Sequence, residues 1–249
     1  MILTVVIGNT NTRFAWFQGS RLVRFRVVPT AAVVRRGKLP KSDRASAVAV
    51  ASVVPAGTRA VRACLRTRAG SQPLVVGPHT RTGLRFRYRR QELGADRVCT
   101  AAGARHGFPD RDIIVLDFGT ATTVNVILRE GIFAGGAILP GIQMSLDALA
   151  AGTAVLPKLA LARMRSPLQH DTGAAVQAGV ANLFAGGVDR IIDRTEHVLG
   201  RSLLVVSTGG AAGIARRYSR RPGLLKPHLA SEGLVELLHL NRHPKAEKP

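Results

Sequence analysis

The sequence contains few cysteines, few aromatic residues and no long hydrophobic run. Cys64 and Cys99 form no CxxC spacing, so neither a disulfide framework nor a zinc motif is expected. Aromatic residues make up only 4% of the chain, which leaves little surface for stacking on nucleic-acid bases. The apolar runs are strand-sized, and Met1 leads into a strand without a basic leader, so neither a transmembrane helix nor a signal peptide is expected. These features favour a cytoplasmic protein without membrane contact.

Acidic residues are also scarce. The 249 residues include 36 Lys and Arg but only 15 Asp and Glu, which gives a net charge of +21. Such a field attracts anions, whether nucleotides, acidic metabolites or nucleic acid. Arginine-rich coding bias explains the same composition without any partner. His239 and His243 have ligand spacing, but they lie at the end of the last expected helix and lack the Glu of HExxH, so we expect no zinc site.

The stretch from Val115 to Val126 organises the chain. An apolar run ending at Leu116 predicts a buried strand, and Gly119 allows a tight turn with close approach of a ligand. The turn offers hydroxyls and backbone N–H groups that suit phosphate oxygens. Asp117 stands at the mouth of this turn, where it either holds a cation or only caps a hairpin. Three residues supply the hydroxyls: Thr120, Thr122 and Thr123.

The same strand–turn–strand motif occurs twice in the chain. Val5–Phe14 aligns with Leu116–Asn125 without a gap, so that Gly8 falls on Gly119. Internal repeats of this kind indicate architecture. Two strand–turn–strand copies predict an α/β protein of two RNase-H-like domains, as in actin-like ATPases, with mixed sheets flanked by helices and a nucleotide cleft between them. We expect the domains to cover residues 1–111 and 112–249.

Element patterns support this division. The first half follows the order β-β-β-α-β-α-β. Thr172 is expected to be the N-cap of the longest helix. The expected strands are residues 2–8, 12–18, 21–28, 46–54, 73–76, 113–116, 131–139 and 203–207. The expected helices are residues 56–67, 94–106, 142–151, 173–199 and 211–218, with a last helix that begins at Ser231.

Two further segments carry candidate site residues. Arg85, Arg87 and Arg89 alternate along one strand face, which indicates either a solvated face or an anion site. Asp96 lies in the first turn of the helix opened by Gly94, where the helix dipole favours an anion. It either caps the helix or acts as a base beside an anion anchor, Arg97.

Together these motifs resemble the type III pantothenate kinases of the acetate and sugar kinase/Hsp70/actin superfamily, which are related to the Bvg accessory factor proteins. Six matching segments occur in family order over nearly the whole chain. They are Gly8–Thr12, Ala51–Pro55, Gly94–Arg97, Asp117–Thr123, Gly135–Gly141 and Thr208–Gly210.

The resemblance implies ATP-dependent phosphorylation of pantothenate, the first step of coenzyme A synthesis, by a homodimer that uses Mg²⁺ and a monovalent cation, K⁺ or NH₄⁺. It implies that Asp96 is the catalytic base and that Asp117 binds the monovalent cation. The implied substrate-binding residues are Gly94, Ala95, Asp96, Arg97, Thr172 and Tyr88. The implied ATP-binding residues are Val6, Ile7, Gly8, Asn9, Thr10, Asn11, Thr12, Arg13 and Thr120.

The chain departs from the family pattern at three places. Val6 replaces the Asp that ends the first strand and organises Mg²⁺ near the phosphates. Tyr88-Arg89-Arg90-Gln91 lacks the Asn-Pro of the family's Tyr-x-Asn-Pro, and Asn125 replaces another Asp. The alternatives are therefore an impaired kinase-fold homologue with a regulatory role, or a protein that binds nucleic acid through its arginines. The nucleic-acid alternative is the weaker one, because the sequence has no known binding module.

Overall fold

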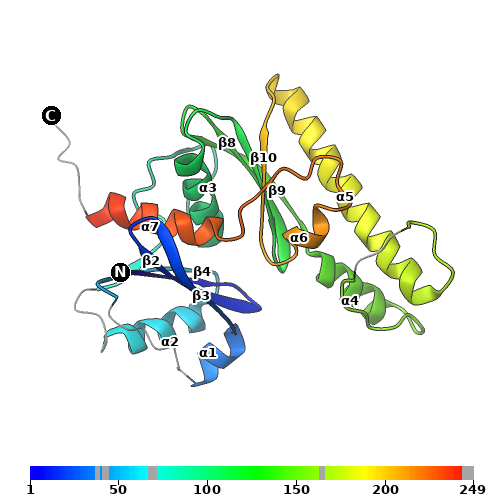
Figure 1. The fold of residues 1–249 in the computed structure, drawn as a ribbon, viewed down its shortest axis with the longest axis horizontal. Coiled ribbons are helices and arrows are strands. Elements are labelled where there is room, and N and C mark those ends of the chain that lie inside the picture. Colours follow the sequence, from blue (N-terminus) through cyan, green and yellow to red (C-terminus); the bar gives the residue numbers. More distant parts are fainter. Residues whose placement is uncertain (37–39, 41–44, 67–71, 163–165, 243–249) are drawn as a thin grey trace. The chain divides into compact units, whose positions relative to one another are not determined.

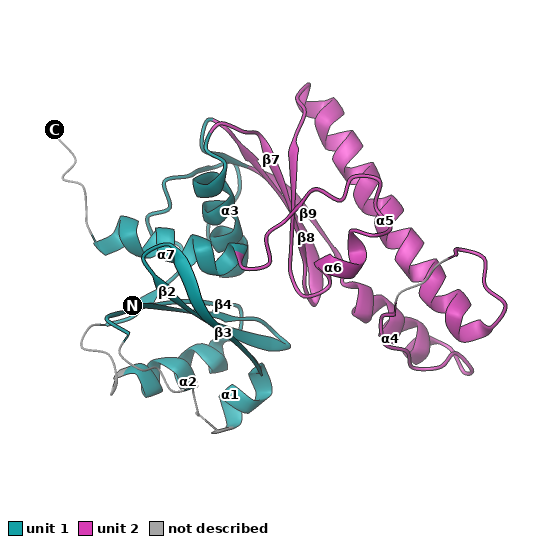
Figure 2. Cartoon of the chain, in the orientation of Figure 1, with its two compact units in different colours: residues 1–109, 130–133, 229–249 teal, residues 110–129, 134–228 magenta. Residues whose placement is uncertain are grey.

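The chain divides into two compact units in the computed structural model, which describes residues 1–36, 40, 45–66, 72–162 and 166–242 (Figure 1). Unit 1 comprises residues 1–109, 130–133 and 229–249, and unit 2 comprises residues 110–129 and 134–228 (Figure 2). The structure has a five-stranded sheet, which lies in unit 1, and a six-stranded sheet in the order β11-β10-β7-β8-β9-β6. Most of the six-stranded sheet lies in unit 2, but β6 and the first two residues of β9 belong to unit 1.

Unit 1 is built on a five-stranded mixed sheet in the order β3-β2-β1-β4-β5. Its first three strands form two antiparallel hairpins, and β4 and β5 add in parallel to β1. The strands are rich in Val, Ile and Phe, as buried strands are. Their bounds are β1 Ile2–Ile7, β2 Asn11–Gln18, β3 Arg21–Pro29, β4 Ala47–Ser52 and β5 Leu74–Val75.

Alternation along β1 and β2 sends side chains to two covered faces of this sheet. Leu3, Val5 and Ile7 lie on one face, in a core shared with Val33 of α1 (Thr30–Arg36) and Val61 of α2 (Pro55–Arg66). The other face carries Ala15 and Phe17, which pack with Val235 of α7 (Leu229–Arg242). Helix α3 (Ala95–Gly107) packs against α7 and β4 on this second face.

Unit 1 also contains a short parallel ladder. The two residues of β6 (Arg85–Phe86) pair with Ile132 and Phe133, the first two residues of β9 (Ile132–Pro140). The remainder of β9 lies in unit 2.

Unit 2 contains strands in the order β11-β10-β7-β8-β9. β7 and β8 form the central antiparallel hairpin, and β10 and β11 extend the sheet in parallel on the other side of β7. Four of the six residues of β7, Ile113–Leu116, are fully buried, as expected for a strand covered on both faces. The bounds are β7 Ile113–Phe118, β8 Ala121–Leu128, β10 Leu204–Thr208 and β11 Leu224–Leu225.

Three helices pack within unit 2. The long helix α5 (Thr172–Leu199) lies beside α4 (Ile142–Gly152) and contacts α6 (Ala212–Ala215), as Figure 1 shows. α5 turns its apolar side, including Phe184, Val188 and Ile192, inward at helical spacing. Gly200 ends the helix in the left-handed conformation, with φ 60°.

The α/β class with mixed sheets flanked by helices is confirmed, as is the order β-β-β-α-β-α-β of the first half. Several details of the sequence prediction were wrong. Asp171, not Thr172, is the N-cap of α5, and its carboxylate accepts the Ala174 N–H at 2.8 Å. α6 is only four residues long, and α7 begins at Leu229. The division into domains 1–111 and 112–249 stays a prediction, while the compact units group α7 with the N-terminal sheet.

Candidate functional site

The turn between β1 and β2 is the first candidate phosphate-binding element. Val6 and Ile7 end β1, residues 8–10 form the turn, and β2 begins at Asn11 and continues through Thr12 and Arg13. The Gly8 N–H donates to the Asn11 carbonyl at 3.0 Å, and a Cβ on Gly8 would lie 3.2 Å from that oxygen. Glycine therefore allows the close turn that the sequence predicts.

Thr30, at the start of α1, holds this turn in place through hydrogen bonds. Its hydroxyl donates to the Gly8 carbonyl at 2.7 Å and lies 3.0 Å from the Thr12 hydroxyl, while its N–H donates to the Thr10 carbonyl. Asn9 and Thr10 remain exposed at the tip. The turn is thus fixed at its base and open at its tip, as a ligand cradle requires.

Helix α3 begins beside the end of β1. The Val53 N–H, just beyond β4, donates to the Ile7 carbonyl at 3.1 Å, and a Cβ on Gly94 would lie 3.6 Å from the Val53 side chain. Since Gly94 is the N-cap of α3, the start of this helix lies next to the end of the strand that leads into the Gly8 turn. Unit 1 therefore brings together two of the predicted site segments, residues 6–13 and 94–97.

Asp96 lies half-buried in the first turn of α3. Its Oδ1 accepts the Arg97 N–H at 2.8 Å, and the same oxygen would lie only 2.5 Å from a Cβ at position 94. Glycine at position 94 thus leaves room for the carboxylate to fold back over the helix start.

Arg97 is 5% exposed and lies against aromatic rings. Its guanidinium carbon is 5.2 Å from the centre of the Tyr88 ring and 5.7 Å from that of Phe133. Tyr88, another predicted substrate-binding residue, therefore lies beside Arg97 in unit 1. Arg85, Arg87 and Arg89 are exposed, but the expected strand that carries all three was wrong, because β6 covers only Arg85–Phe86.

The interior behind Asp96 is apolar. Burial raises the pKa of the Cys99 thiol far above its ordinary value, and the nearby Asp96 carboxylate raises it further. Burial also lowers the pKa of Arg90, whose guanidinium donates to the Gly77 and Thr80 carbonyls. Cys99 is therefore held as a neutral thiol and is not a nucleophile.

The turn between β7 and β8 is the second candidate element, and it lies in unit 2. Asp117 is half-buried at the end of β7, and Thr120 is exposed at the turn. Asp117 is in register with Thr123 of β8 and with Thr208 of β10. Residues in register lie side by side on one sheet face, so a carboxylate is flanked by two hydroxyl side chains.

Two glycines allow other segments to close on this second turn. A Cβ on Gly209, which has φ +95°, would lie 2.5 Å from Oδ1 of Asp117. A Cβ on Gly141 would lie 2.0 Å from the Thr120 carbonyl oxygen. The predicted segments 117–123, 135–141 and 208–210 therefore converge within unit 2 at the end of β7.

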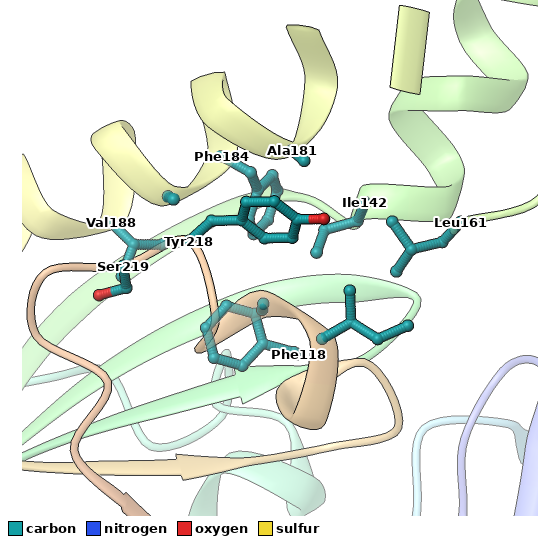
Figure 3. A pocket seen from close by; sticks show the side chains of 11 residues that line it. Phe118, Ile142, Leu161, Ala181, Phe184, Val188, Tyr218 and Ser219 are labelled. Carbon is teal, nitrogen blue, oxygen red and sulfur yellow. The ribbon is translucent and has the colours of Figure 1, made fainter. Parts of the chain in front are cut away.

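An apolar pocket supports the second turn from behind. Phe118 lies 6.1 Å from Phe184 of α5, measured between ring centres, and Ile142 and Leu161 line the same pocket. Figure 3 shows Tyr218 reaching across this pocket toward Ile142. This packing holds Phe118 on the sheet face that carries the pocket. Because side chains alternate along a strand, Asp117 lies on the opposite face of the sheet.

Thr172 lies in unit 2 as the first residue of α5, where it is exposed. The structure gives it no capping role, because Asp171 takes that place. Its predicted contact with substrate stays a prediction. His243, one of the two histidines with ligand spacing, lies outside the described residues.

Comparison with known proteins identifies the family. The family model described as type III pantothenate kinase matches residues 2–194. The chain is 35% identical to the type III pantothenate kinase of Parafrankia sp., over 98% of this chain and 100% of that protein. It is 38% identical to the protein of the same name from Salinispora arenicola, over 94% and 97% of the two chains. The chain belongs to the type III pantothenate kinase family.

Solved structures agree with the predicted actin-like ATPase fold. A conserved protein of the Baf family of transcriptional activators from Campylobacter jejuni superposes with a TM-score of 0.60 at 18% identity, over 96% and 98% of the two chains. The activator of the 2-hydroxyisocaproyl-CoA dehydratase from Clostridium difficile, with bound ADPNP, gives 0.51 at 12% identity, over 100% and 99%. These likenesses concern the fold alone.

Within this kinase family, the chain's departures now have a structural setting. Val6 is 4% exposed and, because β1 alternates, points to the sheet face on which α3 lies. It is paired with Arg13 across the hairpin. Asn125 is fully buried on β8, where its amide donates to the Thr123 hydroxyl at 3.3 Å. Relatives with the kinase name give no support to the alternative of a regulatory homologue without activity.

Sequence reasoning missed two residues of these sites. Thr30 fixes the Gly8 turn, and Phe133 contacts Arg97, but neither stands in a motif. The available signals were weak. Thr30 follows Pro29 at the start of a helix, and Phe133 precedes the paired glycines of residues 135–136.

Proposed function

We propose that this type III pantothenate kinase transfers the γ-phosphoryl group of ATP to the primary hydroxyl of pantothenate, forming 4′-phosphopantothenate. The observation that carries the proposal is the start of α3 beside the end of β1, which places Asp96 on the same side of unit 1 as the Gly8 turn. Phosphoryl transfer needs mainly positioning and charge neutralisation, so one carboxylate beside a phosphate-binding turn is sufficient protein chemistry.

In this proposal Asp96 orients the pantothenate hydroxyl. The hydroxyl oxygen forms a bond to the γ-phosphorus while the bond from that phosphorus to the β,γ-bridging oxygen breaks, and ADP leaves with the electron pair. The hydroxyl proton passes to the Asp96 carboxylate. An aspartate is a weak base toward an alcohol, but in a loose transition state it receives the proton late.

Arg97 binds the pantothenate carboxylate in the same proposal, and Gly94, Ala95 and Tyr88 complete the substrate site. A guanidinium pairs with a carboxylate through two parallel hydrogen bonds. Arg97 also lies in the first turn of α3, where the helix N-terminus adds to the positive potential. Thr172 is the further substrate contact that the family resemblance implies.

The two turns bind ATP. Residues 6–13 surround the phosphates through the Gly8 turn, and Thr120 contacts the nucleotide from the second turn. The cradle around Asp117, which a Cβ on Gly209 would fill, fits a K⁺ or NH₄⁺ ion, because carboxylate and hydroxyl oxygens suit such cations. The ion neutralises phosphate charge when bound. Mg²⁺ arrives with ATP, since residues 6–12 contain no carboxylate.

We further propose a homodimer formed through unit 2. Large apolar side chains are exposed on α5 and β9, with Leu183 77% and Ile138 62% accessible. Exposed apolar patches mark contact surfaces. Sedimentation of the purified chain, compared with a Leu183→Glu variant, tests this point. A wild-type monomer would contradict it.

Cytoplasmic location and the absence of membrane contact also stay proposals. No helix among the described residues is long and apolar enough to span a bilayer.

The proposed reaction is tested by ADP release from purified protein with ATP, Mg²⁺ and K⁺, with and without pantothenate. We expect release that depends on pantothenate, and phosphopantothenate in the product mixture by mass spectrometry. The proposal would be contradicted by ADP release that does not depend on pantothenate, or by the absence of ADP release at every K⁺ concentration. Salt-sensitive retention on duplex DNA without nucleotide binding would instead support the nucleic-acid alternative.

A further inference from the structure

Phe133 lies at the centre of a cluster of three rings and two guanidinium groups in unit 1. The Phe133 ring centre is 5.6 Å from that of Phe86 and 6.0 Å from that of Tyr88. The Arg90 guanidinium lies 4.6 Å from the Phe86 ring centre, and the Arg97 guanidinium contacts the rings of Tyr88 and Phe133. These five residues, Phe86, Tyr88, Arg90, Arg97 and Phe133, are called the Phe133 cluster below.

Arg97 needs such neighbours because its position is unfavourable for a cation. It lies in the first turn of α3, where the helix dipole opposes positive charge, and it is 5% exposed. A guanidinium withdrawn from water is stabilised by the negative face of an aromatic ring, and this attraction strengthens on desolvation. The two rings therefore offset part of the cost of holding Arg97 at the helix start.

The cluster is fixed by backbone pairing as well as by ring contacts. The Arg85 N–H donates to the Gly131 carbonyl at 2.9 Å, and the Arg87 N–H donates to the Phe133 carbonyl at 3.0 Å. The Tyr88 ring stands edge-on to the Phe133 ring, with an interplanar angle of 85°. This arrangement leaves one ring face of each residue directed at Arg97.

Phe133 and Tyr88 differ in exposure. Phe133 is fully buried and Tyr88 is half-buried, while Arg97 is the first buried residue of α3. Phe133 therefore supports the guanidinium from the interior, and Tyr88 covers it from the side nearer to solvent.

We propose that Phe133 is a positioning residue for pantothenate recognition. Its ring holds the Arg97 guanidinium in the orientation that pairs with the substrate carboxylate. The inference rests on the proposed function, in which Arg97 binds that carboxylate. Phe133 itself touches neither substrate nor nucleotide.

Replacement of Phe133 by Leu tests the proposal, because Leu keeps an apolar side chain but removes the ring face. We expect the KM for pantothenate to rise about tenfold, with kcat and the KM for ATP within about twofold of wild type. Pantothenol, which carries an alcohol in place of the carboxylate, reports on Arg97 directly. The preference for pantothenate over pantothenol falls in Phe133→Leu and is restored in Phe133→Tyr.

Phe17→Leu is the matched control. Phe17 is a buried phenylalanine of unit 1 that packs with Ala15 and Val235, at the end of β2 away from the Gly8 turn. Thermal melting of both variants measures the loss of packing. If the KM for pantothenate rises equally in both variants, or in neither, the positioning role of Phe133 is wrong.

A second readout separates this inference from the proposed reaction. Side-chain protons of Arg97 lie beside two rings, so their NMR signals are shifted by ring currents. These signals are assigned by their loss in Arg97→Lys. We expect that shift to decrease in Phe133→Leu, which keeps only the Tyr88 ring beside Arg97, and to stay unchanged in Phe17→Leu. A wild type that leaves pantothenate unphosphorylated overturns the reaction, whereas an unchanged Arg97 signal in Phe133→Leu overturns the positioning role.

Discussion

The two glycine turns align without a gap in sequence, yet the structure closes them differently. In unit 1, the last pair of the hairpin is Ile7 with Thr12, so that residues 8–11 lie between the two paired residues. In unit 2, Phe118 pairs with Thr122, and only residues 119–121 lie between them. The second turn is thus one residue tighter, and a one-residue change of register exchanges the two faces of a strand.

The turns also differ in charge. Asp117 ends β7 beside two threonines in register, whereas Val6 occupies the corresponding place on β1. The carboxylate of unit 1 instead stands on α3, as Asp96. In the proposed reaction, Asp96 of unit 1 receives the proton of the acceptor hydroxyl, and Asp117 of unit 2 holds the monovalent cation.

Removing the unit 1 carboxylate is the strongest way to break this division. Asp96→Asn keeps the shape of the side chain, but the amide cannot accept the proton of the substrate hydroxyl as the carboxylate does. We expect kcat to fall by about 10²- to 10⁴-fold with little change in the KM for ATP, measured as pantothenate-dependent ADP release.

Glu92→Gln is the control for Asp96→Asn. Glu92 is exposed four residues upstream and pairs with the exposed Arg89 in a surface ion pair of 3.1 Å. Its replacement should leave kcat unchanged. Full activity of Asp96→Asn would remove Asp96 from the catalytic role.

Removing the unit 2 carboxylate should produce a smaller loss with a different signature. We expect Asp117→Asn to lower kcat by about 10²-fold and to abolish the dependence on K⁺, because an amide holds a cation less well than a carboxylate. Activity measured against K⁺ concentration checks this, with the exposed Asp110→Asn as control. A variant with normal kcat and normal K⁺ dependence would place the cation elsewhere.

Adding a carboxylate to the first turn is the reverse experiment. Val6→Asp should lower the Mg²⁺ concentration for half-maximal activity by about threefold, since a carboxylate beside the phosphates helps to orient the metal. The side chain is buried, so melting temperature should fall by about 4 °C, although Arg13 directly opposite offers a partner.

Val6→Asn provides the neutral comparison for that variant. Both substitutions bury a polar group, but only Asp adds charge. Identical Mg²⁺ curves for the two variants would show that the first turn does not contact the metal, and the difference between the turns would then have no consequence for catalysis.

The comparison of the turns also shows how much the sequence could predict. Strand periods and glycine positions were sufficient for both hairpins, the mixed sheets and the helix opened by Gly94, because these depend on local patterns. The register of the second turn was not predictable, since a gapless alignment carries no information on which residues pair. The cap of α5 was misassigned because Asp171 and Thr172 are both good N-cap residues.

The segments of the candidate site could be recognised from motifs, whereas the residues that support them could not, and the roles of Asp96 and Asp117 in the reaction stay predictions. Asp96, Asp117 and both turns stand in recognisable segments. Phe133 acts on Arg97 through a contact between residues far apart in sequence, and Thr30 fixes a turn that precedes it by about twenty positions. Such contacts depend on tertiary packing, for which a single sequence gives no pattern.

The smallest expected effect concerns an ion pair in each unit, Arg221–Glu196 in unit 2 and Arg89–Glu92 in unit 1. In unit 2, Arg221 donates to both carboxylate oxygens of Glu196 at 2.8 Å, and this hydrogen bonding, together with the Leu203 N–H, holds the pKa of Glu196 below its ordinary value. A carboxyl group with a lowered folded-state pKa contributes stability above its unfolded pKa, and loses that contribution as pH falls through the folded value.

We therefore expect Glu196→Gln to cost about 1 kcal/mol of stability at pH 7. The difference from wild type should begin to shrink as pH falls below about 4 and vanish only below the folded-state pKa of Glu196. Glu92→Gln in unit 1 should cost nothing at either pH, because Arg89 and Glu92 are 83% and 57% exposed. Thermal melting across this pH range measures both variants. Equal losses in the two variants would mean that the Glu196 pair behaves as an ordinary surface pair, and that bidentate geometry contributes nothing to unit 2.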